Sequence, residues 1–412
     1  MIRHHGSPIP TAEFCMRILV LTDYGTLDGG AEVIVLGLRE ALRARGHVVH
    51  VFTSSAGADV GDSFADTRCF GTKTALRTPL QSLNFSAART LRRVLEEFRP
   101  DVIHVNLYLT QLSPLILREF GEIPAVYYAQ WYRAICPLGT RRLPSGETCQ
   151  KRAGTVCVGS GCLPSWDWPF MWFQMQLDQA WGNRFSRVAA ISHAVARRLK
   201  QFGAAHLVNP AVIYPGTPVV SPRTDMASDP VVLAAGRMVP DKGFDILIRA
   251  FAKIARSQPR AQLILLGDGP QLSSLRELSQ QLGMSDRVEF RGRRSHAETQ
   301  HTIRSAWVVC MPSLWEEPLG MMSVESQMQG VAVLASSTGG LPETLADNET
   351  GAVVPPGDVA ALSKTLETLL GDRERTWNLG MRGHQRAREL FGLDVAAVRF
   401  ESFFHQAIEN RG

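Results

Sequence analysis

The chain has 412 residues, of which 45% are hydrophobic, as in an ordinary globular protein. This length exceeds what one ordinary core accommodates, so we expect two domains, or three at most. The net charge of +5 suits an anionic substrate or membrane surface, but no basic block or recognised motif for nucleic-acid binding accompanies it, so nucleic acid is not expected as a partner.

Targeting signals are not evident in the sequence. No apolar run approaches the roughly 18–20 residues that a membrane-spanning helix needs. Residues 1–15 lack the apolar core of a secretory signal, and we expect them to be a disordered extension, or Met16 to be the true start. We therefore expect a cytoplasmic protein.

The first half of the chain alternates strands and helices. A buried strand begins at Met16 with RILVLTDYG, and a helix that ends near Gly46 leads to a second strand. SAARTLRRVLEEFRP predicts another helix, and DVIHVN, IPAVYYAQW and SRVAAIS predict further strands. This order indicates a parallel sheet over residues 16–220, with an insertion rich in Cys and Trp at about 130–180.

The polar stretch SPRTDMASDP, residues 221–230, is expected to be a linker, and the alternation restarts after it. We expect a second doubly wound domain over 231–390 and a packing helix within 391–412. The predicted fold class is therefore α/β, with two Rossmann-like domains that face one another across a cleft.

One loop of the second domain carries two cations. In GRMVPDKGFDIL, Arg237 follows a strand and Lys242 precedes a helix. Ligands of such sheets bind at the carboxyl ends of the strands, and cations beside a helix N-terminus suit a diphosphate. The alternative is a pair of solvated surface charges.

Two glutamates follow a later strand. Glu317 and Glu325 are separated by seven residues, and a helix is expected to start near Gly320. Glu325 would then lie one to two turns into that helix, and Glu317 in the loop before it. Backbone N–H groups near Leu319 to Met322 would point at the same ligand. Carboxylates suit sugar hydroxyls, although a helix-dipole carboxylate and a solvated one remain an alternative.

These motifs together resemble the family 4 retaining glycosyltransferases of the GT-B fold. The resemblance rests on GRMVPDKG, GDGP, MPSLWEEPLGMMSVESQMQG and STGGLPETL in this order, and upstream on DGGAE, AAISHAV and VIYPGTP. It extends from about Met16 to the C-terminus. It implies a transfer of sugar from a nucleoside diphosphate sugar to an acceptor, as a hexosyltransferase-type enzyme, in the synthesis of cell-surface polysaccharide or glycolipid.

The resemblance also implies residue roles. Arg237 and Lys242 would hold the diphosphate, Glu317 the transferred sugar and Glu325 the ribose. Gly29 and Gly30 would form a loop that closes over the phosphates, and the loops at Gly267, Gly269 and Gly292 would meet the base. The other expected donor contacts are Gly236 and the backbone at Leu319, Gly320, Met321 and Met322. No cofactor is expected for catalysis, and the last helix is expected to cross back to the first domain.

Gln130 departs from the family pattern. In PAVYYAQWYRAICP, Gln130 and Trp131 occupy positions that commonly hold His and Asp. Glutamine can contact an acceptor or sugar hydroxyl but cannot take a proton at neutral pH. A non-catalytic nucleotide-sugar-binding or scaffold subunit is therefore an alternative, as is another GT-B enzyme such as an epimerase or a phosphorylase.

Four cysteines fall in one window: Cys136, Cys149, Cys157 and Cys162. A structural zinc site is one expectation, since Cys157 and Cys162 have a ligand-like gap, and free thiols are the alternative. A disulfide is expected less than either of these, because the cytoplasm is reducing. Nearby, WDWPFMWFQMQ is aromatic enough for an acceptor platform or for peripheral contact with the inner face of the membrane, or simply for packing.

The expected partners are a UDP- or GDP-sugar donor and a sugar or lipid-linked acceptor. Base, sugar and linkage depend on pocket residues from distant loops, so the sequence leaves them open.

Overall fold

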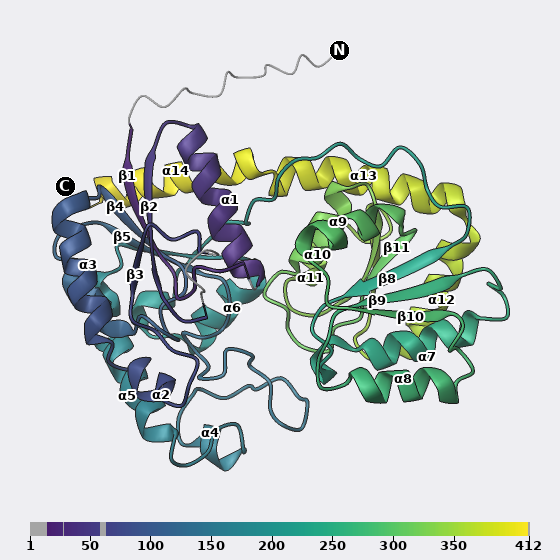
Figure 1. The fold of residues 1–412 in the computed structure, drawn as a ribbon, viewed down its shortest axis with the longest axis horizontal. Helices are drawn as coiled ribbons and strands as arrows, with labels where there is room; N and C mark the ends of the chain where they lie inside the picture. The colour runs from purple at the N-terminus through teal and green to yellow at the C-terminus, as the bar shows by residue number, and fades with distance from the viewer. Residues whose placement is uncertain (1–14, 28, 58–62, 411–412) are drawn as a thin grey trace. The chain divides into compact units, whose positions relative to one another are not determined.

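The computed structural model describes residues 15–27, 29–57 and 63–410, and it contains two parallel sheets (Figure 1). The expected extension therefore lies almost entirely outside the described residues. The first sheet has the order β3-β2-β1-β4-β5-β6-β7, and the second has the order β10-β9-β8-β11-β12-β13. The α/β fold class predicted from the alternation is confirmed.

The strands of the first sheet are β1 (Arg17–Leu21), β2 (Val48–Ser54), β3 (Thr67–Cys69), β4 (Val102–Val105), β5 (Ala125–Ala129), β6 (Arg187–Ala190) and β7 (Ala211–Val212). Those of the second are β8 (Val231–Ala235), β9 (Gln262–Leu266), β10 (Val288–Gly292), β11 (Val308–Met311), β12 (Ala332–Ser336) and β13 (Gly351–Val354).

The α-helices before the second sheet are α1 (Gly30–Ala44), α2 (Arg77–Leu80), α3 (Phe85–Phe98), α4 (Val156–Gly159), α5 (Trp168–Trp181) and α6 (His193–Phe202). The later ones are α7 (Phe244–Ile254), α8 (Leu272–Gln281), α9 (His296–Ser305), α10 (Met321–Met328), α11 (Leu341–Thr344), α12 (Val359–Gly371), α13 (Arg373–Phe391) and α14 (Leu393–Glu409).

Local sequence explains where several helices begin and end. The Asn84 side chain accepts a hydrogen bond from the Ala87 N–H at the start of α3, and Ser295 and Glu298 form a capping box on α9. After α1, Gly46 adopts a left-handed φ of 94°, the conformation that ends helices and that glycine reaches without steric cost. The helix end predicted at Gly46 is thus confirmed.

The chain forms two compact units. Unit 1 comprises residues 1–129, 166–189 and 397–412, and unit 2 comprises 130–165 and 190–396. Residues 130–165 and 190–220 are thus grouped with the strands of the second sheet, and the linker expected at 221–230 stays a prediction. The last helix belongs to unit 1 from Ala397 onwards.

Unit 2 has a core on each face of its sheet. One core joins α7, α8 and α12 to the strands through side chains such as Leu247, Leu275 and Leu366. On the other face, Ile303 of α9 and Leu341 of α11 pack against the strands in two smaller clusters. Figure 1 shows the two groups of helices on opposite faces of the sheet. The strands are buried on both faces and therefore read as continuous apolar runs.

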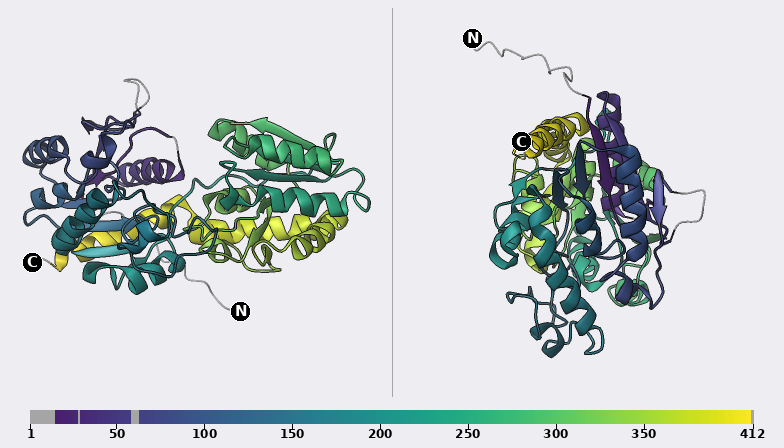
Figure 2. Two further views of the ribbon diagram at one scale, coloured as in Figure 1. Left: turned by 90° about the horizontal axis from the view of Figure 1, so that it is seen from below. Right: turned by 90° about the vertical axis from the view of Figure 1, so that its left-hand side faces the viewer.

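Unit 1 is also covered on both faces. His50 of β2 packs against Phe98 of α3, with ring centroids 5.1 Å apart. His104 of β4 points to the other face, where it packs against Phe400 and Phe404 of α14 at 5.1 and 5.2 Å. Figure 2 shows α3 and α14 on opposite sides of the strands. The last helix is therefore part of the core of unit 1.

Candidate functional site

The carboxyl ends of β8, β9 and β10 form one continuous edge in unit 2. The Gly236 N–H donates to the Leu266 carbonyl at 3.0 Å, and the Gly267 N–H donates to the Gly292 carbonyl at 2.8 Å. A Cβ at Gly267 would lie 1.9 Å from the Gly236 oxygen, and one at Gly269 would lie 2.4 Å from the Met238 oxygen. These glycines are required because neighbouring loops touch, whereas Gly292 faces open space.

Lys242 lies at the end of this edge nearest α7. It closes the short turn Pro240–Lys242, and Gly243, with a left-handed φ of 65°, leads into the helix. The Lys242 ammonium forms an ion pair with Glu317 and lies 5.8 Å from the centre of the Trp315 ring. Arg237, from the same loop, has an exposed side chain. One predicted cation is thus held in place, and the other faces solvent.

Glu317 is a buried carboxylate that the surrounding loops hold firmly. Its Oε1 accepts hydrogen bonds from Lys242 and from the Ser313 hydroxyl, the latter at 2.8 Å, and the residue is 5% exposed. Its backbone carbonyl accepts the Gly340 N–H at 2.7 Å. A buried charge is costly unless it is paired and hydrogen-bonded, and Glu317 is both. The pairing with Lys242 joins two residues that the sequence places 75 positions apart.

Helix α10 begins directly after Gly320, and the predicted start near this residue is confirmed. Gly320 is the N-cap with a φ of 98°, and it offers no side-chain cap to the first N–H groups of the helix. Leu319 before it is buried, and Met321 and Met322 after it are half-buried. Helix N-termini with free N–H groups attract anions, and this one follows directly on the loop that carries Glu317.

Glu325 lies further along α10 and beside a cavity. Its Oε2 accepts a hydrogen bond from the Gln300 amide at 2.7 Å, and burial raises the pKa of its carboxyl group. The cavity measures about 270 Å³, and Glu325, Gln300 and His296 contribute to its lining. A half-buried carboxylate at a cavity wall is a candidate ligand contact.

The remaining predicted contacts are more scattered. Gly29 is the N-cap of α1 in unit 1, with Gly30 as the first helical residue. The predicted contact of this turn with the phosphates stays a prediction, and residue 28 of its motif lies outside the described residues.

Gln130 is buried directly after β5. The four cysteines are free thiols with half-buried side chains.

Sequence reasoning missed two ion pairs that border these loops. Arg198 of α6 forms a bidentate pair with Glu316, and Arg142 pairs with Asp241 at 2.5 Å. Each pair joins a residue of the 130–165 or 190–220 segments to a neighbour of Glu317 or Lys242. The sequence offered one signal for these residues, namely that Glu316 and Asp241 lie next to Glu317 and Lys242. The pairings themselves could not be predicted, because the partners lie far apart in the sequence.

Glu343 and Tyr132 were missed as well. The Glu343 carboxylate accepts hydrogen bonds from the His193 and Ala194 N–H groups at 2.8 and 2.7 Å, which caps α6. Burial raises the pKa of the Tyr132 phenol, and the nearby carboxylates of Glu316 and Glu317 add to this effect. Tyr132 therefore lies close to the predicted sugar-binding carboxylate.

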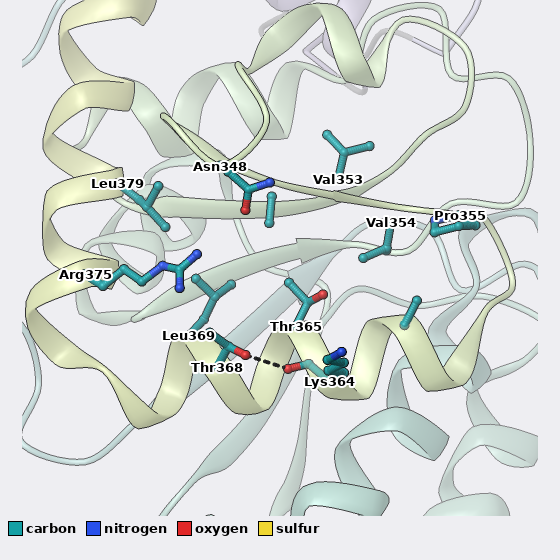
Figure 3. A pocket seen from close by; sticks show the side chains of 12 residues that line it. Asn348, Val353, Val354, Pro355, Lys364, Thr365, Thr368, Leu369, Arg375 and Leu379 are labelled. Carbon is teal, nitrogen blue, oxygen red and sulfur yellow. Dashed lines mark hydrogen bonds between the residues drawn. The ribbon is translucent and has the colours of Figure 1, made fainter.

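Another cavity, shown in Figure 3, is separate from these residues. It measures about 350 Å³ and is lined by β13, α12 and α13. Lys364 and Arg375 lie at its wall, but none of the predicted site residues does. We therefore place the candidate site at the ends of β8 to β10 and at α10.

Two family models match long stretches of this chain. The model of the family described as Glycosyltransferase Family 4 matches residues 28–219, and that of Glycosyl transferases group 1 matches residues 224–386. Among curated proteins, an exopolysaccharide phosphotransferase of Streptomyces coelicolor is 31% identical over 57% of this chain and 22% of its own length. A GDP-mannose-dependent phosphatidylinositol monomannoside mannosyltransferase of Mycobacterium tuberculosis is 33% identical over 44% of this chain and 49% of its own. The chain thus spans half or less of these relatives.

A solved structure shows the same fold. HepE of Anabaena in complex with UDP superposes with a TM-score of 0.70 at 19% identity, over 95% of this chain and 100% of that one.

Proposed function

Since this chain belongs to the family 4, group 1 glycosyltransferases of the GT-B fold, we propose that it transfers a glycosyl group from a nucleoside diphosphate sugar to an acceptor. We also propose that the transferred sugar keeps the anomeric configuration that it has in the donor. This proposal rests mainly on Glu317, which is buried and forms an ion pair with Lys242. Glu317 lies just before the N-terminus of α10, which has no side-chain cap. This arrangement brings together a carboxylate that can bind a sugar, a cation and the N-terminus of a helix.

The chemistry that this geometry supports is relief of negative charge on a departing nucleoside diphosphate. Lys242 and Arg237 supply positive charge, and the first N–H groups of α10 supply the positive end of a helix dipole. Lys242 and the N-terminus of α10 are held in place before the substrate arrives, so they need little reorganisation during the reaction. Lys242 would exchange part of its contact with Glu317 for a phosphate oxygen.

Two carboxylates divide the recognition of the donor. Glu317 would accept hydrogen bonds from hydroxyl groups of the transferred sugar, since it is a carboxylate paired with Lys242. Glu325 would accept the ribose hydroxyls from its place at the cavity wall. The name of the mannosyltransferase relative contains GDP-mannose, and the HepE structure contains UDP, so a GDP- or UDP-sugar is the proposed donor.

We also propose a lipid-linked or saccharide acceptor, delivered at a membrane surface. Helix α5 exposes Phe170, Trp172 and Phe173, and Trp166 just before it is 66% exposed. The one charged side chain of α5, Asp178, is buried. Amphipathic aromatic rings settle at the boundary between headgroups and acyl chains. Among the described residues, no helix is long and apolar enough to cross a membrane, so the contact would be peripheral.

The test is sugar transfer by the purified chain. GDP- and UDP-sugars are incubated with saccharide acceptors and with phosphatidylinositol in anionic vesicles, and the anomeric proton of the product is assigned by NMR. We expect transfer with one donor, the configuration of that donor in the product, and faster transfer in vesicles. Inverted product would reject retention, and equal rates without vesicles would reject the membrane contact. Tight donor binding without turnover would favour a non-catalytic subunit.

A further inference from the structure

The cavity of Figure 3 lies in unit 2, where β13, α12 and α13 meet. Its volume of about 350 Å³ falls among those of small-molecule sites, which usually measure about 300–1,000 Å³. Because β13 is the outer strand of the second sheet, one edge of that sheet and two helices form the walls. The cavity is thus large enough for a small organic ligand.

A tight turn between α12 and α13 brings the two helices together beside the cavity. Asp372, the one residue between them, caps α13 by accepting a hydrogen bond from the Arg375 N–H at 2.9 Å. The buried Thr376 hydroxyl of α13 donates to the Leu369 carbonyl of α12 at 2.6 Å. The residues of α12 that line the cavity are spaced so that they share one face of the helix: Ala361, Lys364, Thr365, Thr368 and Leu369.

Two cations lie at the wall of the cavity, one from each helix. Lys364 belongs to α12 and Arg375 to the first turn of α13, and Figure 3 shows the Arg375 side chain extending from α13 towards α12. In the described part of the chain, neither side chain forms an ion pair. Among the described residues that line the cavity, none is a carboxylate. The cavity therefore has two positive charges without a counter-charge, which favours an anionic ligand.

The Asp347 carboxylate, which is close in sequence to the lining, is already engaged. Its Oδ1 accepts the Val353 N–H at 2.8 Å, and its Oδ2 accepts the Asn348 amide at 3.1 Å. This contact orients Asn348, which Figure 3 shows pointing towards the cavity from the loop before β13. Asp347 therefore supports a polar group of the lining rather than neutralising its cations.

The rest of the lining combines hydroxyl groups with an apolar surface. The Thr368 hydroxyl donates to the Lys364 carbonyl at 3.0 Å, so its oxygen can still accept a hydrogen bond, and Thr365 adds a second hydroxyl. Apolar side chains from all three elements complete the lining: Ala352, Val353, Val354, Leu369 and Leu379. A ligand that fits these groups has an anionic end, hydroxyl groups and a carbon skeleton.

We propose that this cavity binds the phosphate monoester of a small polyhydroxy compound. A phosphate monoester carries a charge of about −1.5 to −2 at pH 7, which matches the two cations. Arg375 can bind two phosphate oxygens at once, and Lys364 adds a point charge. The Asn348 amide and the threonine hydroxyls bind hydroxyl groups of the ligand, and the apolar side chains cover its carbon atoms.

This site is separate from the candidate donor site, and α13 connects the two. Further along α13, a ring nitrogen of His384 lies 2.6 Å from the Met328 carbonyl of α10, against which α13 packs. The ligand would therefore contact the helix that supports α10 without reaching the donor residues. The inference does not depend on the proposed glycosyl transfer, because binding of the ester is measured without donor or acceptor.

The experiment is titration calorimetry with glucose 6-phosphate as the probe, at physiological salt so that non-specific attraction is screened. Glucose and inorganic phosphate are titrated separately, since each supplies only one part of the probe. We expect one glucose 6-phosphate per chain and at least about tenfold weaker binding of either part, because neither makes both sets of contacts.

Lys364→Ala/Arg375→Ala should bind glucose 6-phosphate at least about tenfold more weakly than the wild type, because charge-assisted contacts to the phosphate are lost. The matched control is Lys253→Ala/Arg256→Ala, which removes the same charges at exposed positions of unit 2 that do not line the cavity. It should bind as the wild type does. All four side chains are exposed, so both variants should keep the melting temperature of the wild type.

A final titration distinguishes this cavity from the proposed donor site. Binding of glucose 6-phosphate should persist when UDP or GDP is present in excess. Displacement by either nucleotide would place the ester in the donor site and overturn the proposal. So would an absence of binding by the wild type, equal affinities for glucose 6-phosphate and inorganic phosphate, or undiminished binding by Lys364→Ala/Arg375→Ala.

Discussion

At the scale of single residues, Lys242 and Glu317 depend on one another. The Glu317 side chain is 7% exposed and the Lys242 side chain is 28% exposed. Truncating one member of such a pair leaves the other charge buried without compensation, which is costlier than losing both. The same pair that is proposed to bind substrate is therefore also a structural element of unit 2.

Lys242→Ala should lower the free energy of unfolding by about 2 kcal/mol, less than for a fully buried pair because the ammonium is partly solvated. Adding Glu317→Gln should recover most of this loss, since the double variant carries no unpaired carboxylate. Urea unfolding of both variants measures the difference, with Lys253→Ala as a control at an exposed lysine of α7. A double variant less stable than Lys242→Ala would contradict the coupling.

The sequence was informative about these residues because each belongs to a contiguous motif. The Lys-Gly turn before α7 and the spaced glutamates around Gly320 can be found by position alone. Their partners could not be found in this way. Arg198 contacts Glu316 across 118 positions, and such pairings depend on how helices and loops pack after the chain has folded.

At the scale of elements, the terminal helix α14 forms part of the hydrophobic core of unit 1. Its apolar positions predicted a packing helix, and Phe400 and Phe404 are buried against His104 and Tyr128. The sequence did not show that a histidine would line that contact. Neither ring nitrogen of His104 has a hydrogen-bond partner among the described residues. Burial lowers its pKa to about 3.

This burial predicts an acid sensitivity of unit 1. The lowered pKa means that the folded state favours neutral His104, so its stabilising effect is present above the ordinary pKa near 6.5. That effect is lost as the pH falls from 6.5 towards 3, by about 2 kcal/mol between pH 7 and pH 5.

His104→Phe should remove this part of the pH dependence and keep the aromatic packing. The measurement is the free energy of unfolding at pH 7 and pH 5, with His405→Gln as a control at an exposed position of α14. Because other groups titrate in the same range, the comparison is between variant and wild type at each pH. An unchanged pH dependence in His104→Phe would show that His104 is not the source.

At the scale of the whole molecule, the alternation of strands and helices predicted two parallel sheets and their order of elements. The compact units were less predictable. Residues 130–165 precede the linker, yet they belong to unit 2. Within unit 2, Arg142 of this segment pairs with Asp241, and hydrophobic periodicity carries no information about such a pair. The sequence predicted that Gly236, Gly267 and Gly269 lie at one edge of the second sheet, and the structure places them there. At Gly267 and Gly269, close contact between neighbouring loops requires glycine even without a ligand.

The central claim is that the edge formed by β8 to β10 and α10 binds a nucleoside diphosphate. Titration calorimetry of the wild type with UDP and GDP tests it most directly, with Glu325→Ala and the control Glu367→Ala, an exposed glutamate of α12. Wild type and control should bind one nucleotide with equal affinity, and Glu325→Ala should bind it at least tenfold more weakly, about 1.4 kcal/mol. Undiminished binding by Glu325→Ala, or no binding by the wild type, would contradict the account.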